Sequence, residues 1–224
     1  MTTTSDIPDI KSTAPADNGG CDAVSVVILS SDVRRGRLAE RSVVRCLKGV
    51  DAETLVVDVS NSRDTEAETL RRVLPGLGSH RVVLMDDRML LLNDVTVYDI
   101  GVRKARQVAV GGGRMLTDYS VRMPVLLHRD PLEAMLEYLV REFPHEDVAS
   151  YYMRNTLAEV RPLLLRQWNE DGWLLPLVSE RPDMSVVRKW SERQKFMWIS
   201  LKSWANPAVT AFVEQRLGFS AGGR

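Results

Sequence analysis

The chain has 224 residues, a length that suits one domain, and 44% of them are hydrophobic and 27% charged. Its 30 basic and 30 acidic residues balance, so the composition does not favour binding nucleic acid mainly through phosphate contacts. The longest apolar runs fall short of the roughly 18–20 residues that span a bilayer.

Residues 1–23 are rich in Thr, Ser, Asp, Pro and Gly and lack the apolar core of a signal peptide. We expect a disordered leader there, followed by a single domain over residues 24–224. Cys21 falls in the leader and Cys46 in an apolar helical pattern, so a structural disulfide is not expected. A reducing cytoplasm is the simplest setting for such a chain.

The first half of the domain alternates between strand and helix patterns. A short apolar, β-branched run at residues 24–29 predicts a strand that is buried on both faces, and similar runs predict further strands at 54–58 and 81–85. Apolar residues at three- and four-residue steps predict helices between them, over 38–47 (ended by Gly49) and 64–74 (capped by Asp64). This alternation predicts an α/β fold with a mostly parallel sheet flanked by helices.

Polar side chains follow each of these three strands. Because the carboxyl ends of parallel strands meet at one edge of a sheet, we expect the following residues to share that edge: Ser30, Ser31, Asp32, Asp58 and Asp86. Sheets of this type bind their ligands beyond that edge.

The second half is more mixed, and the expected C-terminal part is helical. Short strands are predicted at 95–98 and 107–110, with a turn at Gly111–Gly113. Helices are predicted over 130–143 (capped by Asp130), through 152–163 to about 167, and over 206–218 (capped by Asn206 and ended by Gly218).

Three segments, in order, resemble the landmarks of the GT-A fold glycosyltransferases. Val24–Arg34 is similar to the opening strand and nucleotide-contacting loop, in which Ser30 and Asp32 would contact the donor. Asp58, followed by Ser60 to Thr65, resembles the aspartate that ends the second strand in this family. The resemblance implies that Asp58 binds the ribose or base of a donor nucleotide such as UDP.

The third landmark is Leu84-Met85-Asp86-Asp87, which resembles the acidic motif of the family. The resemblance implies a nucleotide-diphosphate sugar as donor and Mn²⁺ or Mg²⁺ as cofactor, since two hard carboxylates suit either metal. Asp87 is expected to coordinate the metal directly, and Asp86 to be either a second ligand or a ribose contact.

Pro144-His145-Glu146-Asp147-Val148, with Arg154 downstream, resembles the acidic motif and arginine near the family's acceptor site. An inverting transferase needs a base that takes the proton of the acceptor hydroxyl. The resemblance implies that Asp147 is this base, with Glu146 as the alternative.

The region from Leu126 onward is also similar to stealth-type sugar-phosphate transferases and small phage-encoded glycosyltransferases. If this likeness is the relevant one, His128 and Arg154 replace Asp147 as catalytic residues. A phage-encoded enzyme would act in the host cytoplasm. A third alternative is a non-catalytic GT-A-like module for binding or assembly, and the acceptor stays open among a sugar, a protein, a lipid and a modified nucleic-acid base.

Overall fold

The computed structural model describes residues 23–101, 104–110, 114–118, 124–155, 161–162 and 183–219. Four strands form the main sheet in the order β2-β1-β3-β7. Their bounds are Ala23–Ser30 (β1), Asp51–Asp58 (β2), Arg81–Asp86 (β3) and Val125–His128 (β7). β1 pairs in parallel with β2 and with β3, whereas β7 pairs antiparallel with β3. The predicted α/β fold with a mostly parallel sheet is confirmed.

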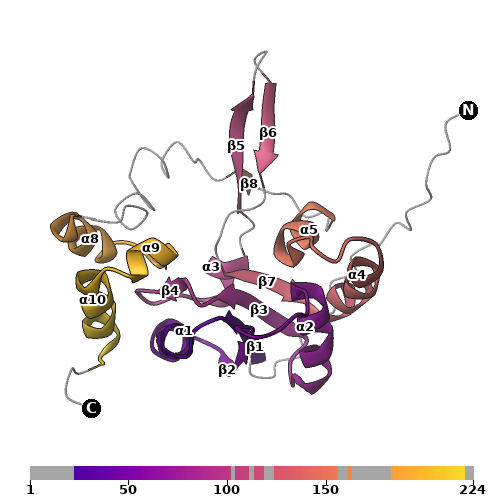
Figure 1. Cartoon of the computed structure of the whole chain (residues 1–224), viewed down its shortest axis with the longest axis horizontal. Coiled ribbons are helices and arrows are strands. Elements are labelled where there is room, and N and C mark those ends of the chain that lie inside the picture. Colours follow the sequence, from indigo (N-terminus) through magenta and orange to yellow (C-terminus); the bar gives the residue numbers. More distant parts are fainter. Residues whose placement is uncertain are drawn as a thin grey trace, which may run out of the picture.

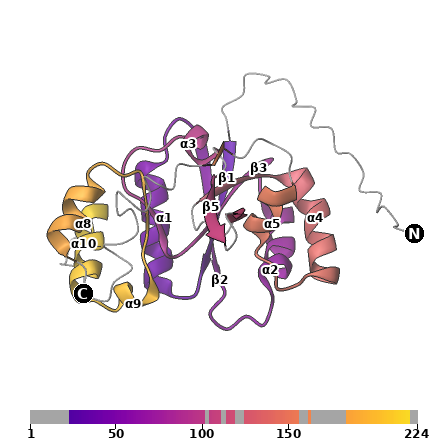
Figure 2. The ribbon, with the colours of Figure 1, turned by 90° about the horizontal axis from the view of Figure 1, so that it is seen from above.

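Helices cover both faces of this sheet (Figure 2). One layer contains α1 (Val33–Cys46), α8 (Met184–Ser191) and α10 (Pro207–Leu217). The other contains α2 (Glu66–Val73), α4 (Arg129–Glu142) and α5 (Val148–Asn155).

The side chains of the buried strands pack against both helical layers, because successive side chains point to opposite faces of the sheet. Val26 and Ile28 of β1 belong to the cluster that includes α1 and α10, whereas Val27 belongs to the cluster that includes α2 and α4. In β3, Val83 and Met85 face the first cluster and their neighbours the second. Burial on both faces explains why these strands are continuous apolar runs in the sequence.

The remaining elements are short and lie around this core. They are η1 (Leu74–Gly76), β4 (Met89–Leu91), α3 (Val97–Gly101), β5 (Lys104–Val110), β6 (Arg114–Asp118), β8 (Arg161–Pro162), β9 (Phe196–Trp198) and α9 (Leu201–Trp204). β4 pairs antiparallel with β9, which brings the C-terminal part beside the end of β3. The β5–β6 hairpin projects from the sheet and its helices (Figure 1).

Helix ends follow local capping chemistry, which corrects one predicted cap. Asp32 caps α1, so this helix begins at Val33, five residues before the apolar stripe that predicted it. Thr65, not Asp64, caps α2, because Thr65 and Glu68 form a reciprocal capping box. The predicted C-terminal helix is confirmed.

Three further predictions in the second half were wrong. The strand predicted at 95–98 is reduced to a parallel bridge between Val95 and Leu47, and Val97 begins α3, where Thr96 and the Asp99 carboxylate bond reciprocally as in a capping box. The predicted cap Asp130 lies inside α4, since His128 occupies the N-cap position. The helix expected to continue through residue 163 ends at Asn155 among the described residues, and β8 follows.

Several sequence features fall outside the described residues, including Cys21, Gly111–Gly113 and all but Ala23 of the expected leader. Cys46 is buried as a free thiol. Among the described helices, none has both the length and the apolar character needed to cross a bilayer.

Candidate active site

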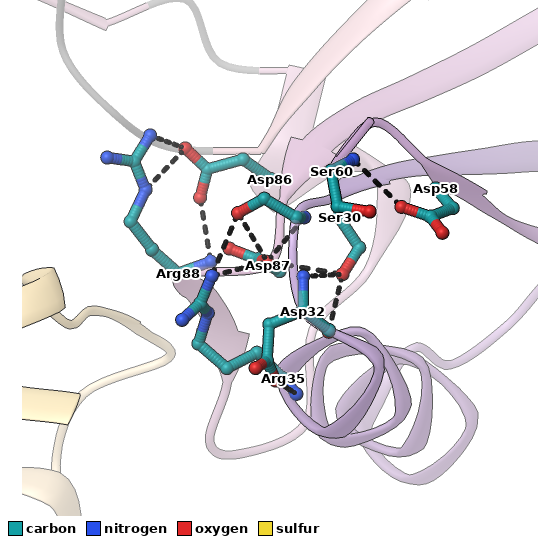
Figure 3. Close-up of polar contacts among 9 residues, drawn as sticks. Ser30, Asp32, Arg35, Asp58, Ser60, Asp86, Asp87 and Arg88 are labelled. Carbon is teal, nitrogen blue, oxygen red and sulfur yellow. Dashed lines mark hydrogen bonds and ion pairs between the residues drawn. The ribbon is translucent and has the colours of Figure 1, made fainter. Parts of the chain in front are cut away.

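The carboxyl ends of the three parallel strands meet at one edge of the sheet. Ser30 at the end of β1 is in register with Asp58 at the end of β2, and Leu29 is in register with Asp86 at the end of β3. Ser30, Asp58 and Asp86 therefore share one edge, as predicted (Figure 3). Because β1 lies between β2 and β3, the two crossovers diverge here, which is where such sheets open a ligand-binding crevice.

The loop from β1 to α1 is held by short-range hydrogen bonds. The Asp32 carboxylate accepts from the N–H of Arg35 at 2.9 Å, and the Ser30 hydroxyl donates to the Asp32 carbonyl at 2.8 Å. A Cβ at Gly36 would lie 2.7 Å from the Ser30 Oγ and 3.0 Å from a methyl group of Val56. Glycine at this position lets the first turn of α1 approach the polar edge closely.

Asp87 is buried at the centre of this edge, with 3% of its surface exposed. Its Oδ2 accepts from the Ser31 N–H at 2.9 Å, the Ser30 hydroxyl at 3.1 Å and the Arg35 Nη2 at 3.2 Å. Its own N–H donates to the carbonyl of Leu29 at 3.0 Å. Asp87 thus joins the ends of β1 and β3 and the first turn of α1.

Asp86 is only partly buried and is paired with Arg88. Its Oδ1 accepts from the Arg88 N–H at 2.8 Å, and its Oδ2 accepts from the Arg88 Nε at 3.1 Å and Nη2 at 2.5 Å. The Arg88 guanidinium lies 5.8 Å from the ring centroid of Trp198 on β9. The C-terminal part of the chain therefore supplies an aromatic wall beside Asp86.

Asp58 is exposed at the end of β2. Its Oδ1 accepts from the Ser60 N–H at 2.8 Å. Hydrogen bonds from the Ser60 side chain and main chain hold the pKa of Asp58 below its ordinary value. The carboxylate is therefore ionised at neutral pH and can accept hydrogen bonds from a ligand's hydroxyl groups.

A cleft of about 470 Å³ opens at this edge, lined by the ends of β1 and β3 and by residues of α2, α5 and α9. Five carboxylates from three segments of the chain line it: Asp64, Glu66, Asp86, Asp87 and Asp147. Arg88 is the basic residue of this lining, and Leu29, Leu84, Met85 and Met89 supply apolar surface. Three of these carboxylates are paired with arginines: Asp64 with Arg72, Asp86 with Arg88 and Asp87 with Arg35. The five carboxylates outnumber these three arginines, which favours a cation in the cleft.

The acidic motif of the second half is divided between the cleft and the surface beside it. Asp147 lines the cleft, and its Oδ1 caps α5 by accepting from the Ser150 N–H at 2.7 Å. Glu146 forms an ion pair with Arg154, whose guanidinium lies 5.8 Å from the Tyr151 ring centroid, and neither charged residue belongs to the cleft lining. The structure therefore brings Asp147, but not Glu146 or Arg154, to the cleft that contains Asp86.

His128 lies at the opposite edge of the sheet. It is in register with Arg81, the first residue of β3, whereas Asp86 is the last. Its N–H donates to the Tyr152 hydroxyl at 3.1 Å, and its side chain is exposed. The structure does not bring His128 together with the acidic cleft.

Sequence analysis missed two arginines and one tryptophan of the site. Arg88 carried a local signal, since it stands two residues after Asp86, where an Asp side chain readily bonds the following backbone. Arg35 lies three residues before the helix expected over 38–47 and belongs to no motif, although it is the third residue of α1 in the structure. Trp198 is more than 100 residues away in sequence, so only the pairing of β4 with β9 brings it to the site.

The donor set at Asp86 and Asp87 suits a divalent cation that arrives with a substrate. Within the described residues, no cluster of three or more His, Cys, Asp or Glu side chains could form a complete protein cage for a metal. Mg²⁺ commonly takes one or two carboxylates and completes its shell with substrate phosphates and water. The two adjacent aspartates fit that arrangement.

No protein-family model and no curated protein matches this chain. Among solved structures, the apo-form glycosyltransferase GlyE of Streptococcus pneumoniae TIGR4 overlaps with a TM-score of 0.40 at 9% identity, over 88% of this chain. The chain spans 62% of the length of that structure.

Two other solved structures overlap to a similar extent. A glycosyltransferase involved in the glycosylation of the major capsid of PBCV-1 gives a TM-score of 0.41 at 12% identity, over 87% of this chain and 99% of its own. The 2-C-methyl-D-erythritol 4-phosphate cytidylyltransferase of Thermus thermophilus gives 0.36 at 12% identity, over 61% and 86%. Overlaps of this size carry no conclusion about activity. The strand order and the cleft define an α/β protein with an acid-lined site at the carboxyl edge of a mostly parallel sheet.

Proposed function

We propose that this chain is a glycosyltransferase that moves a sugar from a nucleotide-diphosphate donor, assisted by Mn²⁺ or Mg²⁺. The observation that carries the proposal is the convergence of Asp86, Asp87 and Asp147 in one cleft at the carboxyl edge of the sheet. This arrangement combines a site for a divalent cation with a separate carboxylate for proton transfer.

On the donor side, Asp58 accepts hydrogen bonds from the ribose hydroxyls of the nucleotide. Its exposure and its lowered pKa support this role, because an ionised carboxylate is a strong acceptor. Ser30 and Asp32 act through the loop that they hold, since the Ser30 hydroxyl and the Asp32 carboxylate are engaged within it.

A diphosphate is negatively charged, so it needs positive charge beside it to bind in a cleft lined by carboxylates. A divalent cation bound at the Asp86-Asp87 end of β3 would stabilise the negative charge that develops on the departing nucleoside diphosphate. Arg88 lies in the same lining and can contribute a second positive charge toward the phosphates.

On the acceptor side, Asp147 is the general base. It takes the proton of the acceptor hydroxyl while that oxygen bonds to the anomeric carbon. The bond from the anomeric carbon to the diphosphate breaks, and the nucleoside diphosphate leaves with the electron pair. The hydrogen bond from the Ser150 N–H fixes the Asp147 carboxylate in the cleft and leaves it able to accept a proton.

Glycosyl transfer is favoured over sugar-phosphate transfer by the position of His128. The alternative mechanism needs this histidine at the reacting centre, and its backbone lies at the other edge of the sheet. If no nucleotide binds, the alternative function of a non-catalytic binding module is favoured.

The test is a calorimetric titration of UDP, GDP and CDP with and without Mn²⁺. We expect one nucleoside diphosphate to bind only with Mn²⁺, and Asp86→Asn to weaken this binding about tenfold or more. Asp51→Asn is the matched control, because Asp51 is an exposed aspartate at the other end of β2. Absence of binding for every nucleotide in the wild-type chain would refute the proposal.

A further inference from the structure

The two adjacent aspartates at the end of β3 stand in different surroundings. The Asp87 side chain is 4% exposed and its Arg35 partner 17%, whereas the Asp86 side chain is 19% exposed and its Arg88 partner 23%. Asp87 has donors from the loop after β1 and from α1, which are distant in sequence. Asp86 is held by Arg88, only two residues away and on the same loop.

Releasing Asp87 from its partners would be costly. The Arg35 guanidinium is largely buried, and its Nε lies buried without a hydrogen-bond partner among the described residues. Without Asp87, a buried positive charge would lose its counter-charge, which strongly destabilises a fold. The Ser31 N–H would also lose its acceptor, so the loop after β1 would no longer be fixed.

Releasing Asp86 is less disruptive. Arg88 lies at the rim of the cleft, against the face of Trp198, so its guanidinium can leave the carboxylate without crossing the core. A diphosphate in the cleft offers it a new anionic partner, and guanidinium groups bind phosphate well. A divalent cation can take the place of Arg88 at Asp86.

We propose that the two aspartates have separate roles, and this proposal rests on the proposed function. Asp86 is the ligand-facing carboxylate, at which Arg88 and a divalent cation compete. Asp87 is a positioning residue that stays bound to Arg35 and fixes the loop that receives the donor. The sequence motif alone favoured the opposite assignment, with Asp87 as the direct ligand.

The first measurement is thermal unfolding of Asp86→Asn, Asp87→Asn and the control Asp51→Asn. We expect a drop of several degrees in the midpoint for Asp87→Asn and little change for the other two. Arg35→Met should lower the midpoint by a similar amount. The double variant Arg35→Met/Asp87→Asn should unfold at no lower a temperature than the single variants, because both substitutions remove the same ion pair. Equal midpoints for Asp86→Asn and Asp87→Asn would overturn the division of roles.

The second measurement is binding of Mn²⁺ alone, followed by the electron paramagnetic resonance signal of the free ion at a temperature well below unfolding. Arg88→Gln should bind Mn²⁺ about fivefold more tightly, because an internal competitor is removed. Asp86→Asn should lose this binding, whereas Asp87→Asn should keep it. Loss of Mn²⁺ binding in Asp87→Asn with an unchanged midpoint would refute the proposal.

The third measurement separates positioning from simple stability. With saturating Mn²⁺ and at low temperature, Asp87→Asn should bind the nucleoside diphosphate about tenfold more weakly, while its Mn²⁺ affinity is unchanged. The neutral amide no longer pairs with Arg35, whose Nη2 also donates to the Ser31 hydroxyl at 2.8 Å, so the loop after β1 shifts. If folded Asp87→Asn binds the nucleotide as tightly as the wild-type chain, Asp87 only stabilises the fold, and its assignment as a positioning residue is wrong. If the wild-type chain binds Mn²⁺ but no nucleotide, the proposed function fails while the first two measurements still decide the roles of the aspartates.

Discussion

The main-chain N–H of Ser31 donates to the carboxylate of Asp87 at 2.9 Å, which ties the end of β1 to the end of β3. Arg35 reaches the same oxygen from α1 at 3.2 Å. A single buried carboxylate thus joins three elements that are separate in sequence. The shape of the cleft depends on this junction as much as on the strands themselves.

Replacing Gly36 by alanine should destabilise the protein, although alanine is the better helix former. The added Cβ would meet the Ser30 Oγ at 2.7 Å, and this hydroxyl is held by Asp32 and Asp87. Crowding of this kind costs about 1–3 kcal/mol, against a gain in helix propensity of about 1 kcal/mol. We expect a lower free energy of unfolding, measured by urea denaturation.

Gly76→Ala is the matched control, because nothing lies within 4 Å of a Cβ built at Gly76. It should be neutral or stabilising by up to about 1 kcal/mol. If Gly36→Ala is as stable as Gly76→Ala, the close approach of α1 to the polar edge is not a constraint.

Asp147→Asn should lower the rate of sugar transfer about 10²–10⁴-fold, the usual contribution of a general base. Asparagine can still accept the hydrogen bond from the Ser150 N–H and cap α5, so the fold and nucleotide binding should persist. Turnover is measured with the donor identified by calorimetry, or as hydrolysis of that donor.

Glu146→Gln controls for loss of a neighbouring carboxylate. Glu146 pairs with Arg154 outside the cleft lining, so the turnover of the Glu146→Gln variant should stay within about a factor of two of wild type. A large loss with Glu146→Gln and none with Asp147→Asn would exchange the two assignments.

The capping box of α2 should make stability depend on acid. Hydrogen bonds from the Thr65 main chain and side chain lower the pKa of Glu68. Because this pKa is lower in the folded chain, the contribution of Glu68 is present above the ordinary glutamate value of about 4.3 and is lost as pH falls through the folded value.

Glu68→Gln tests this dependence by thermal unfolding at several pH values. The wild-type midpoint should exceed that of the variant at neutral pH, and the difference should shrink in acid. In a Thr65→Ala background, which removes the hydroxyl of the cap, the pH-dependent part of the difference should decrease. A difference that is constant with pH would contradict the assignment.

Cys46 should be chemically inert in the folded protein. Its side chain is buried, its Sγ lies 3.5 Å from the Leu91 carbonyl, and burial raises the pKa of the thiol. Because the pKa is raised, the protonated thiol favours the folded state below the ordinary value of about 8.5, and this contribution is lost as pH rises further.

A Cys21→Ser variant leaves Cys46 as the one thiol for Ellman's reagent. At about pH 8, we expect reaction at least about 100-fold slower in buffer than in guanidinium chloride, because the thiol is reached only when the structure opens. Comparable rates would show that Cys46 is accessible in the folded state.

The sequence by itself determined the central part of the fold. Apolar runs at 24–29, 54–58 and 81–85, with helical periodicity between them, predicted the parallel strands β1, β2 and β3. The prediction succeeded because apolar strand runs and amphipathic helices each have a pattern that is visible locally, even in β2, which is only partly buried at the side of the sheet. It also placed Ser30, Asp58 and Asp86 at one edge, because parallel strands share their carboxyl ends.

Where local signals compete, the sequence was insufficient. Val95 to Tyr98 has a β-branched composition, yet the bonds between Thr96 and Asp99 start a helix there. Composition indicates only a preference, and a cap that satisfies backbone donors can outweigh it.

The roles within the site were decided by the tertiary structure alone. Asp86 and Asp87 are adjacent and chemically identical, yet one meets Arg88 at the rim and the other meets Arg35 in the interior. Trp198 and Asp147 reach the site, and His128 does not, through strand pairing and helix packing across long stretches of chain. Apart from the local pair of Asp86 and Arg88, burial and charge partners here depend on contacts between distant segments, which no local pattern of residues encodes.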